Sequence, residues 1–223
     1  MKNVVVRKGV LKPSEGKHEN ISEQFIWRKT GNFVGKNQIV IMDTQEPIWW
    51  NRPLESDIMV KQEDDGLYSY NLPFLGNRDV YKTGYNLLLG KNSITYTGHI
   101  LLDDSWTEEQ KDKLLRLSYD ALYESLLELG VDETKLQRTR NDMLYNGKKF
   151  AGGEQVISGS VYTEDMVITM QFLPEKDIFS RLTGKYANVR GITGIEEEVS
   201  NVTKEKLIEK MYNKITQFFA ELD

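Results

Sequence analysis

The segment from Thr107 to Gly130 constrains the fold most, because both its ends and its apolar face are marked in the sequence. Thr107 and Gln110 have the spacing of a capping box, and Gly130 occupies the position at which helices commonly end in glycine. Between them, leucines recur at helical spacing, at positions 114, 115, 117, 122, 126 and 129. The spacing predicts one long amphipathic helix over this segment.

Runs of β-branched and aromatic residues predict strands on both sides of this helix. These strands are expected at Val4–Val6, Gln38–Met42, Ile58–Val60, Ile94–Leu102, Asn141–Tyr145, Val156–Tyr162 and Met166–Phe172. Hairpin turns are expected at Asn146-Gly147 and at Thr163–Asp165. Helical spacing predicts a final helix over Lys204–Leu222 and shorter ones over Ile21–Trp27 and Glu175–Leu182, while Gly66–Gly90 is expected to be irregular.

Strands with helices inserted and appended predict an α+β fold, with a mixed, largely antiparallel sheet flanked by helices. The 223 residues are expected to form a single domain over 1–223. A net charge of −5 argues against nucleic acid as a partner. No apolar run is long enough to span a bilayer, so we expect no membrane association and a cytoplasmic location. The absence of cysteine excludes disulfides, thiolate metal sites and a cysteine nucleophile.

The run from Asn141 to Gly153 is the part of the sequence that points to chemistry. It combines a predicted strand, a tight turn at Asn146-Gly147, and Lys149 close to two glycines. Glycines let backbone N–H groups approach a phosphate, and a nearby ammonium stabilises developing negative charge. The pattern predicts an anion site, although a solvated hairpin with ordinary surface lysines explains the same spacing.

The same run resembles the signature of the lipoate-protein ligase A family, within the biotin/lipoate protein ligase superfamily. That signature has an Asn-Asp pair, then a Gly-Lys-Lys turn, a hydrophobic residue, a small residue and a glycine. Asn141-Asp142 and the stretch from Gly147 to Gly152 match it. The strand Ile94–Leu102, the helix ending at Gly130, and the later Lys185-Tyr186 and Val189-Arg190-Gly191-Ile192-Thr193 follow in the family's order.

The resemblance implies a ligase catalytic domain that activates lipoate or octanoate with ATP. The acid becomes an acyl adenylate, and the acyl group then passes to a lysine of a carrier domain. Lys149 takes the place of the family's essential lysine, which binds the acyl carbonyl and the α-phosphate without becoming acylated. Asn141 would orient the loop, and Asp142 would lie near the phosphates through a Mg²⁺ ion.

The resemblance assigns the remaining site residues in the same way. Gly147 and Gly152 are expected to bind ATP or the adenylate, together with the residues above. Gly153, Arg78 and Gly84 are expected at the acyl substrate, although a surface arginine and a turn glycine explain Arg78 and Gly84 equally well. The lack of cysteine favours the adenylate route, since related octanoyltransferases carry the acyl group as a cysteine thioester.

The implied partners are a lipoyl carrier domain or the H-type carrier protein of glycine cleavage. The helix Lys204–Leu222 ends the sequence, so no accessory C-terminal domain is expected, and a separate subunit would supply one. The family's triple glycine is replaced by Asn77-Arg78-Asp79-Val80-Tyr81-Lys82-Thr83-Gly84. This difference leaves open a catalytically altered protein with a binding or regulatory role. Biotin ligation is less favoured, because no Gly-Arg-Gly signature occurs.

Three other features have simpler explanations. Trp49-Trp50 is expected to pack onto the core, with stacking on a ligand as the alternative. The run Glu196–Glu198 is expected to be a solvated face and not a metal site. Arg138 and Arg140 could meet an acidic carrier or a phosphate, or could be ordinary charges on a strand edge.

Overall fold

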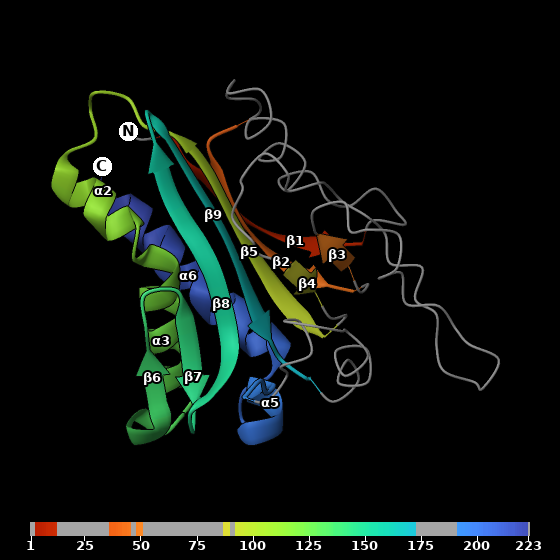
Figure 1. Cartoon of the computed structure of the whole chain (residues 1–223). Coiled ribbons are helices and arrows are strands. Elements are labelled where there is room, and N and C mark those ends of the chain that lie inside the picture. Colours follow the sequence, from red (N-terminus) through yellow and green to blue (C-terminus); the bar gives the residue numbers. More distant parts are fainter. Residues whose placement is uncertain are drawn as a thin grey trace.

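A seven-stranded sheet forms the centre of the molecule (Figure 1). The computed structural model describes residues 3–12, 36–45, 48–50, 87–89, 92–172 and 191–222. The strands, in spatial order, are β1 (Val5–Leu11), β2 (Gln38–Thr44), β5 (Ser93–Leu101), β9 (Val161–Thr169), β8 (Lys148–Ser158), β7 (Asp142–Tyr145) and β6 (Leu136–Arg138). Only β1 and β2 run parallel within this sheet. The predicted mixed, largely antiparallel sheet is therefore confirmed.

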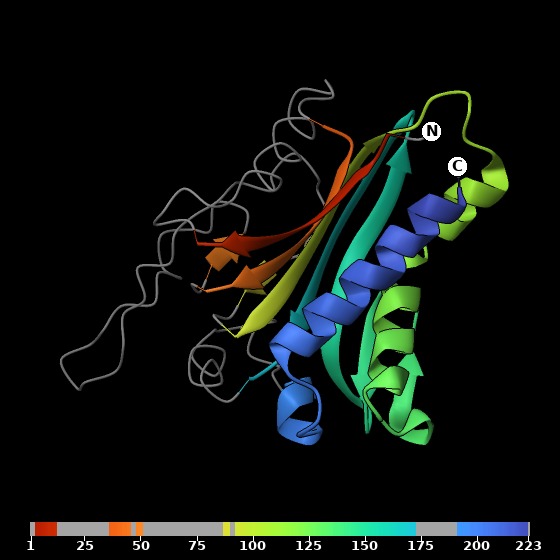
Figure 2. The ribbon, with the colours of Figure 1, turned by 180° about the vertical axis from the view of Figure 1, so that it is seen from behind.

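The longer helices cover one face of this sheet (Figure 2). They are α2 (Glu108–Leu114), α3 (Leu117–Glu128) and α6 (Lys204–Glu221), while η4 (Glu133–Lys135) and α5 (Ile195–Glu198) are single turns. The helix α6 crosses the sheet diagonally beside α3, and Leu207, Met211, Ile215 and Phe219 are buried along it. A separate two-stranded sheet pairs β3 (Ile48–Trp50) with β4 (Leu87–Leu89).

Alternation along the strands separates the two faces of the sheet. In β9, Tyr162, Met166 and Ile168 belong to the core beneath the helices, which we call the helix face. The intervening residues point to the opposite side, the second face. In β2, β5 and β9 this second face carries many polar residues that are nevertheless buried: Gln38, Thr44, Ser93, Thr95, Thr97, His99, Thr163 and Asp165.

The structure corrects three sequence predictions. The helix expected over Thr107–Gly130 has its predicted capping box and a positive-φ Gly130, but it breaks at Leu115-Arg116 into α2 and α3. No glycine or proline marks that break. The turn expected at Thr163–Asp165 is wrong, because the chain reverses at Gly159, between β8 and β9. Leu87–Leu89, expected to be irregular, forms β4.

A carboxylate is buried within the helix face. Glu164 of β9 accepts hydrogen bonds from the hydroxyls of Ser118 and Tyr162, and from Gln155 Nε2 at 3.0 Å. Burial raises the pKa of Glu164 to about 7, although these three hydrogen bonds favour the charged form and act in the opposite direction. This carboxyl is therefore expected to change charge near neutral pH.

Several predictions lie outside the described residues. They are the helices over Ile21–Trp27 and Glu175–Leu182 and the strand at Ile58–Val60. The side chains of Trp49 and Trp50 also lie outside the description, so their packing stays a prediction. Among the helices the structure does describe, none has the length and apolar character needed to cross a bilayer.

Candidate active site

The two lysines of the sequence motif directly follow a two-residue turn. Asn146 and Gly147 have φ values of 50° and 74°, and Tyr145 pairs with Lys148 directly beside them. Positive φ at both central positions is the geometry that Asn-Gly hairpins adopt. The predicted hairpin is confirmed, and it joins β7 to β8, beside the edge strand β6.

A β-bulge follows the turn and sets where Lys149 points. The pairing changes from Leu144↔Lys149 to Met143↔Ala151, which makes Phe150 the additional residue of β8. Lys148 and Lys149 are exposed, whereas Phe150 and Ala151 are buried. Residues three apart in a regular strand face opposite sides. The bulge instead places Lys149 on the second face together with Gly152.

The ammonium group of Lys149 lies beside Asp142 and above Gly152. Lys149 Nζ is 2.5 Å from Asp142 Oδ1, and both side chains remain partly exposed. A Cβ atom added at Gly152 would lie 2.4 Å from Lys149 Nζ and 2.8 Å from Asp142 Oδ1. The absence of a side chain at Gly152 is therefore what leaves room for this ion pair.

The two adjacent glycines have different roles, which alanine substitutions would separate. A Cβ at Gly153 would lie 2.0 Å from the backbone oxygen of Asp165, which cannot move away without distorting β9. We expect Gly153→Ala to lower the free energy of unfolding by roughly 1–3 kcal/mol. Gly152→Ala should cost far less, because the flexible end of Lys149 can move aside, but it should displace the ammonium. Urea denaturation of both variants tests this, and equal destabilisation would contradict it.

A tyrosine from the helix layer holds the start of the motif. The Tyr119 hydroxyl donates to the backbone carbonyl of Asn141 at 2.6 Å, and the N–H of Gly153 donates to the same oxygen at 3.1 Å. Burial raises the pKa of Tyr119, so its hydroxyl stays a donor. The structure thus shows a role for the Asn141 backbone, while the roles assigned to Asn141 and Gly153 in ligand binding stay predictions.

The segment Gly191–Thr193 pairs with the backbone of Lys149. Lys149 N donates to Gly191 O at 2.5 Å, and Thr193 N donates to Lys149 O at 2.9 Å. Two parts of the family pattern, 42 residues apart, meet here.

Sequence reasoning did not identify Tyr119 or Glu198 as part of this site. Glu198 contacts the segment Gly191–Thr193 through Thr193. Tyr119 looked like one more residue of an amphipathic helix, and Glu198 like part of a solvated acidic run.

The other predicted residues fall into three groups. Arg78 and Gly84 lie outside the described residues, so their roles stay predictions. Arg138 forms an ion pair with Asp120, and Arg140 is exposed in the loop before β7. Within the described ranges, no three His, Asp or Glu side chains are arranged to hold a metal ion. A Mg²⁺ ion near Asp142 would therefore take its other ligands from phosphate oxygens and water.

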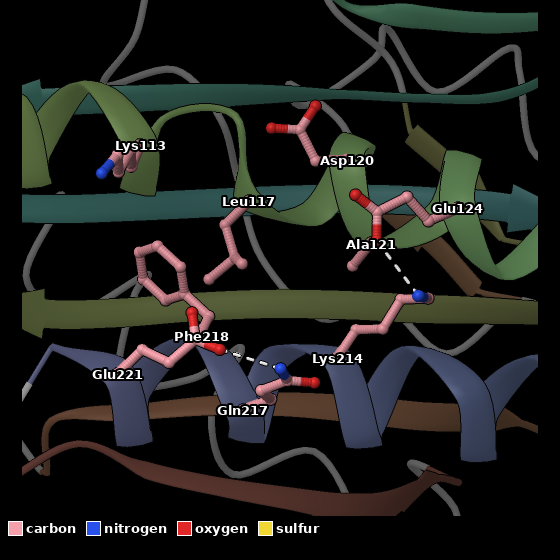
Figure 3. A pocket seen from close by; sticks show the side chains of 9 residues that line it. All are labelled: Lys113, Leu117, Asp120, Ala121, Glu124, Lys214, Gln217, Phe218 and Glu221. Atoms are coloured by element: carbon pink, nitrogen blue, oxygen red, sulfur yellow. Dashed lines mark hydrogen bonds and ion pairs between the residues drawn. The ribbon is translucent and has the colours of Figure 1, made fainter.

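A groove of about 270 Å³ lies between α3 and α6 on the helix face (Figure 3). Leu117, Ala121 and Phe218 provide its apolar part between α3 and α6. Across it, Lys214 Nζ is 3.0 Å from Glu124 Oε2. The groove and the Lys149 ion pair therefore lie on opposite faces of the sheet.

Comparison with known proteins identifies the fold. No protein-family model matches the chain, and no curated protein matches it in sequence. A lipoate-protein ligase A bound with ATP superposes with a TM-score of 0.62 at 12% identity, over 98% of this chain and 85% of the other. The bi-partite lipoate protein ligase from Thermoplasma acidophilum gives 0.62 at 14% identity, over 97% and 84%.

A biotin protein ligase is also similar. The enzyme from Leishmania major, in complex with biotinyl-5-AMP, gives a TM-score of 0.51 at 14% identity, over 98% of this chain and 75% of the other. The matches to lipoate ligases are closer than this one, and all of them extend across nearly the whole chain. The chain therefore has the fold that these lipoate and biotin protein ligases share.

Proposed function

We propose that this protein is an ATP-dependent acyl ligase for lipoate or octanoate. The observation that carries the proposal is the Lys149 ammonium, held beside Asp142 above Gly152 on the second face of a lipoate-ligase fold. An ammonium in that position suits a site where a carboxylate meets a phosphate, because both carry negative charge that it can stabilise.

The reaction would have two steps. The carboxylate of the acid attacks the α-phosphorus of ATP, and pyrophosphate leaves. The amine of a carrier lysine then attacks the acyl carbonyl, a proton is lost, and AMP leaves. Lys149 would bind the acyl carbonyl oxygen and an α-phosphate oxygen through both steps. Asp142 would keep Lys149 oriented and could share a Mg²⁺ ion with the phosphates.

The proposed partner is a lipoyl carrier domain or an H-type carrier protein. The ligase from Thermoplasma acidophilum is described together with its E2 lipoyl domain and as bi-partite. By analogy, we propose that 1–223 is a catalytic domain and that a separate subunit supplies any accessory domain it requires. Mixing the chain with a candidate subunit and comparing adenylate yield with and without it would test this dependence.

The test of the proposed function is a direct assay of both products. Purified protein is incubated with ATP, Mg²⁺, octanoate or lipoate, and a lipoyl domain. Pyrophosphate release and a carrier whose mass has increased by one acyl group are the expected results. A parallel reaction with biotin separates the two branches of the superfamily. Binding of a non-hydrolysable lipoyl-adenylate analogue without turnover would favour the alternative, a binding or regulatory protein. If the protein shows no binding and no turnover, the proposal is refuted.

A further inference from the structure

Glu198 links the two chain segments that meet at Lys149. Its Oε1 accepts a hydrogen bond from Lys148 Nζ at 2.9 Å and another from Thr193 Oγ1 at 2.9 Å. Lys148 belongs to β8, and Thr193 belongs to the segment that pairs with Lys149. These contacts hold the pKa of Glu198 below its ordinary value, first through Lys148 and then through Thr193. The carboxylate is therefore ionised at neutral pH.

These contacts complete a closed ring around the backbone of Lys149. Thr193 N donates to Lys149 O, and Lys149 N donates to Gly191 O. Glu198 joins Thr193 back to Lys148, the residue bonded to Lys149. Both backbone polar groups of Lys149 are thus bonded to a segment that the Glu198 carboxylate contacts.

The neighbouring glutamate anchors the short helix that carries Glu198. Glu197 Oε1 accepts from Phe172 N at 2.9 Å, and Glu197 Oε2 accepts from Gly194 N at 3.1 Å. At Gly194, an added Cβ would lie 2.4 Å from Met170 O, so α5 begins in direct contact with the chain that follows β9. The carboxylate of Glu198 therefore extends from an anchored support.

Lys149 needs such support because the ladder changes register beside it. The bulge leaves β7 with only Leu144↔Lys149 and Tyr145↔Lys148 on the turn side. A bulge disrupts the ladder locally, so strand pairing alone defines this end poorly. The bridge to Ile192 takes over on the other side of Lys149.

We propose that Glu198 is a positioning residue, which fixes the Lys149 backbone so that the ammonium stays above Gly152. The proposal rests on the proposed function only in so far as Lys149 acts on the substrate. Glu198 itself contacts no reacting group. Its contribution is to restrict the directions from which the lysine side chain can extend.

Amide hydrogen exchange measured by NMR tests, without requiring activity, whether the Glu198 contacts hold the backbone of Lys149 and Thr193 in place. We call this set of contacts the clamp. The Lys149 and Thr193 amides are compared in wild type, Glu198→Ala, Glu198→Gln and the control Glu196→Ala. Glu196 lies on the same turn, and its side chain forms no hydrogen bond or ion pair with the described residues. Glu198→Ala removes the hydrogen bonds from Lys148 and Thr193, and we expect exchange at both amides to be about tenfold faster, a change that matches the energy of about one charge-assisted hydrogen bond.

The variants should separate a local effect from a general one. Glu198→Gln should lie between wild type and Glu198→Ala, because its amide oxygen still accepts but carries no charge. Glu196→Ala should match wild type. Amides of the central strands β5 and β9 should exchange at the wild-type rate in every variant. Unchanged exchange at Lys149 and Thr193 in Glu198→Ala, or equal acceleration across the whole sheet, would overturn the clamp.

Steady-state kinetics of adenylate formation completes the test. Glu198→Ala should lower kcat about tenfold with a smaller change in KM for ATP, because the ammonium is misplaced more than the nucleotide. Lys148→Ala should have a similar effect, and the double variant should be little worse than either single one. Faster exchange with unchanged kcat would overturn the positioning role. A wild type that forms no adenylate would refute the proposed function, while the exchange result would still decide the clamp.

Discussion

Lys149→Ala is expected to reduce adenylate formation by roughly a hundredfold to a thousandfold, the range seen when one preorganised donor to a developing charge is removed. The fold should be unaffected, because the side chain is about half exposed and its ammonium contacts Asp142 at the surface of the second face. Pyrophosphate release in the first turnover isolates this step from transfer to the carrier.

Two further variants make the Lys149 result specific. Lys149→Arg keeps the charge but replaces a compact ammonium with a larger planar group, so it should restore only a small part of the activity. Lys113→Ala removes an exposed lysine of α2 that pairs with Glu109, far from the site, and should behave as wild type. If Lys149→Ala retains wild-type turnover, the chemistry assigned to the hairpin is wrong.

Stability should fall by about 3 kcal/mol as Glu164 ionises between pH 4.5 and pH 7. Its pKa is about 7 in the folded protein against an ordinary value of 4.5. Below pH 4.5 both states hold the proton, and the fold has its full stability with respect to this group. As pH rises, the unfolded chain loses the proton first, so ionisation favours unfolding until the folded carboxyl also titrates.

The measurement is urea denaturation at several pH values in wild type, Glu164→Gln and Glu205→Gln. Glu164→Gln cannot titrate, so its free energy of unfolding should gain on wild type as pH rises through this window. Any fixed loss from weaker hydrogen bonds to Ser118 and Tyr162 adds a constant offset at every pH. Glu205 is exposed on α6, and its variant should follow wild type. Parallel curves for wild type and Glu164→Gln would contradict a raised pKa.

The sequence predicts β2, β5 and the terminal helix well, because their signals are local. β2, β5 and α6 lie within two residues of their expected bounds, since β-branched runs and helical spacing arise from neighbouring residues. The turn expected at Thr163–Asp165 is wrong because this prediction also used only neighbouring residues. Three consecutive polar residues suggest a turn, yet here one of them, Glu164, is satisfied by Ser118 from α3, which is 46 residues away.

The candidate site shows the same division between local and distant information. The Asn146-Gly147 turn and the nearby Lys149 follow from adjacent residues and from the family resemblance. The Tyr119 contact with Asn141, the pairing of Lys149 with Gly191–Thr193, and the Glu198 contacts all join segments distant in sequence. No single-sequence pattern specifies such contacts, because they depend on how the finished sheet and helices pack.

Because of the bulge in β8, the direction in which the Lys149 side chain points depends on the hairpin turn. On the turn side, Tyr145 faces Lys148, whereas beyond the bulge Asp142 faces Gly152, so the two ends of this ladder follow registers that differ by one residue. If the register that pairs Asp142 with Gly152 continued to the turn without a bulge, Lys149 would lie opposite Tyr145 and point toward the helices. Asn146-Gly147 strongly prefers a two-residue hairpin turn, and this preference stabilises the register that requires the bulge. A surface turn, where proteins usually tolerate change, is thus a place where substitution would redirect the Lys149 side chain without altering it.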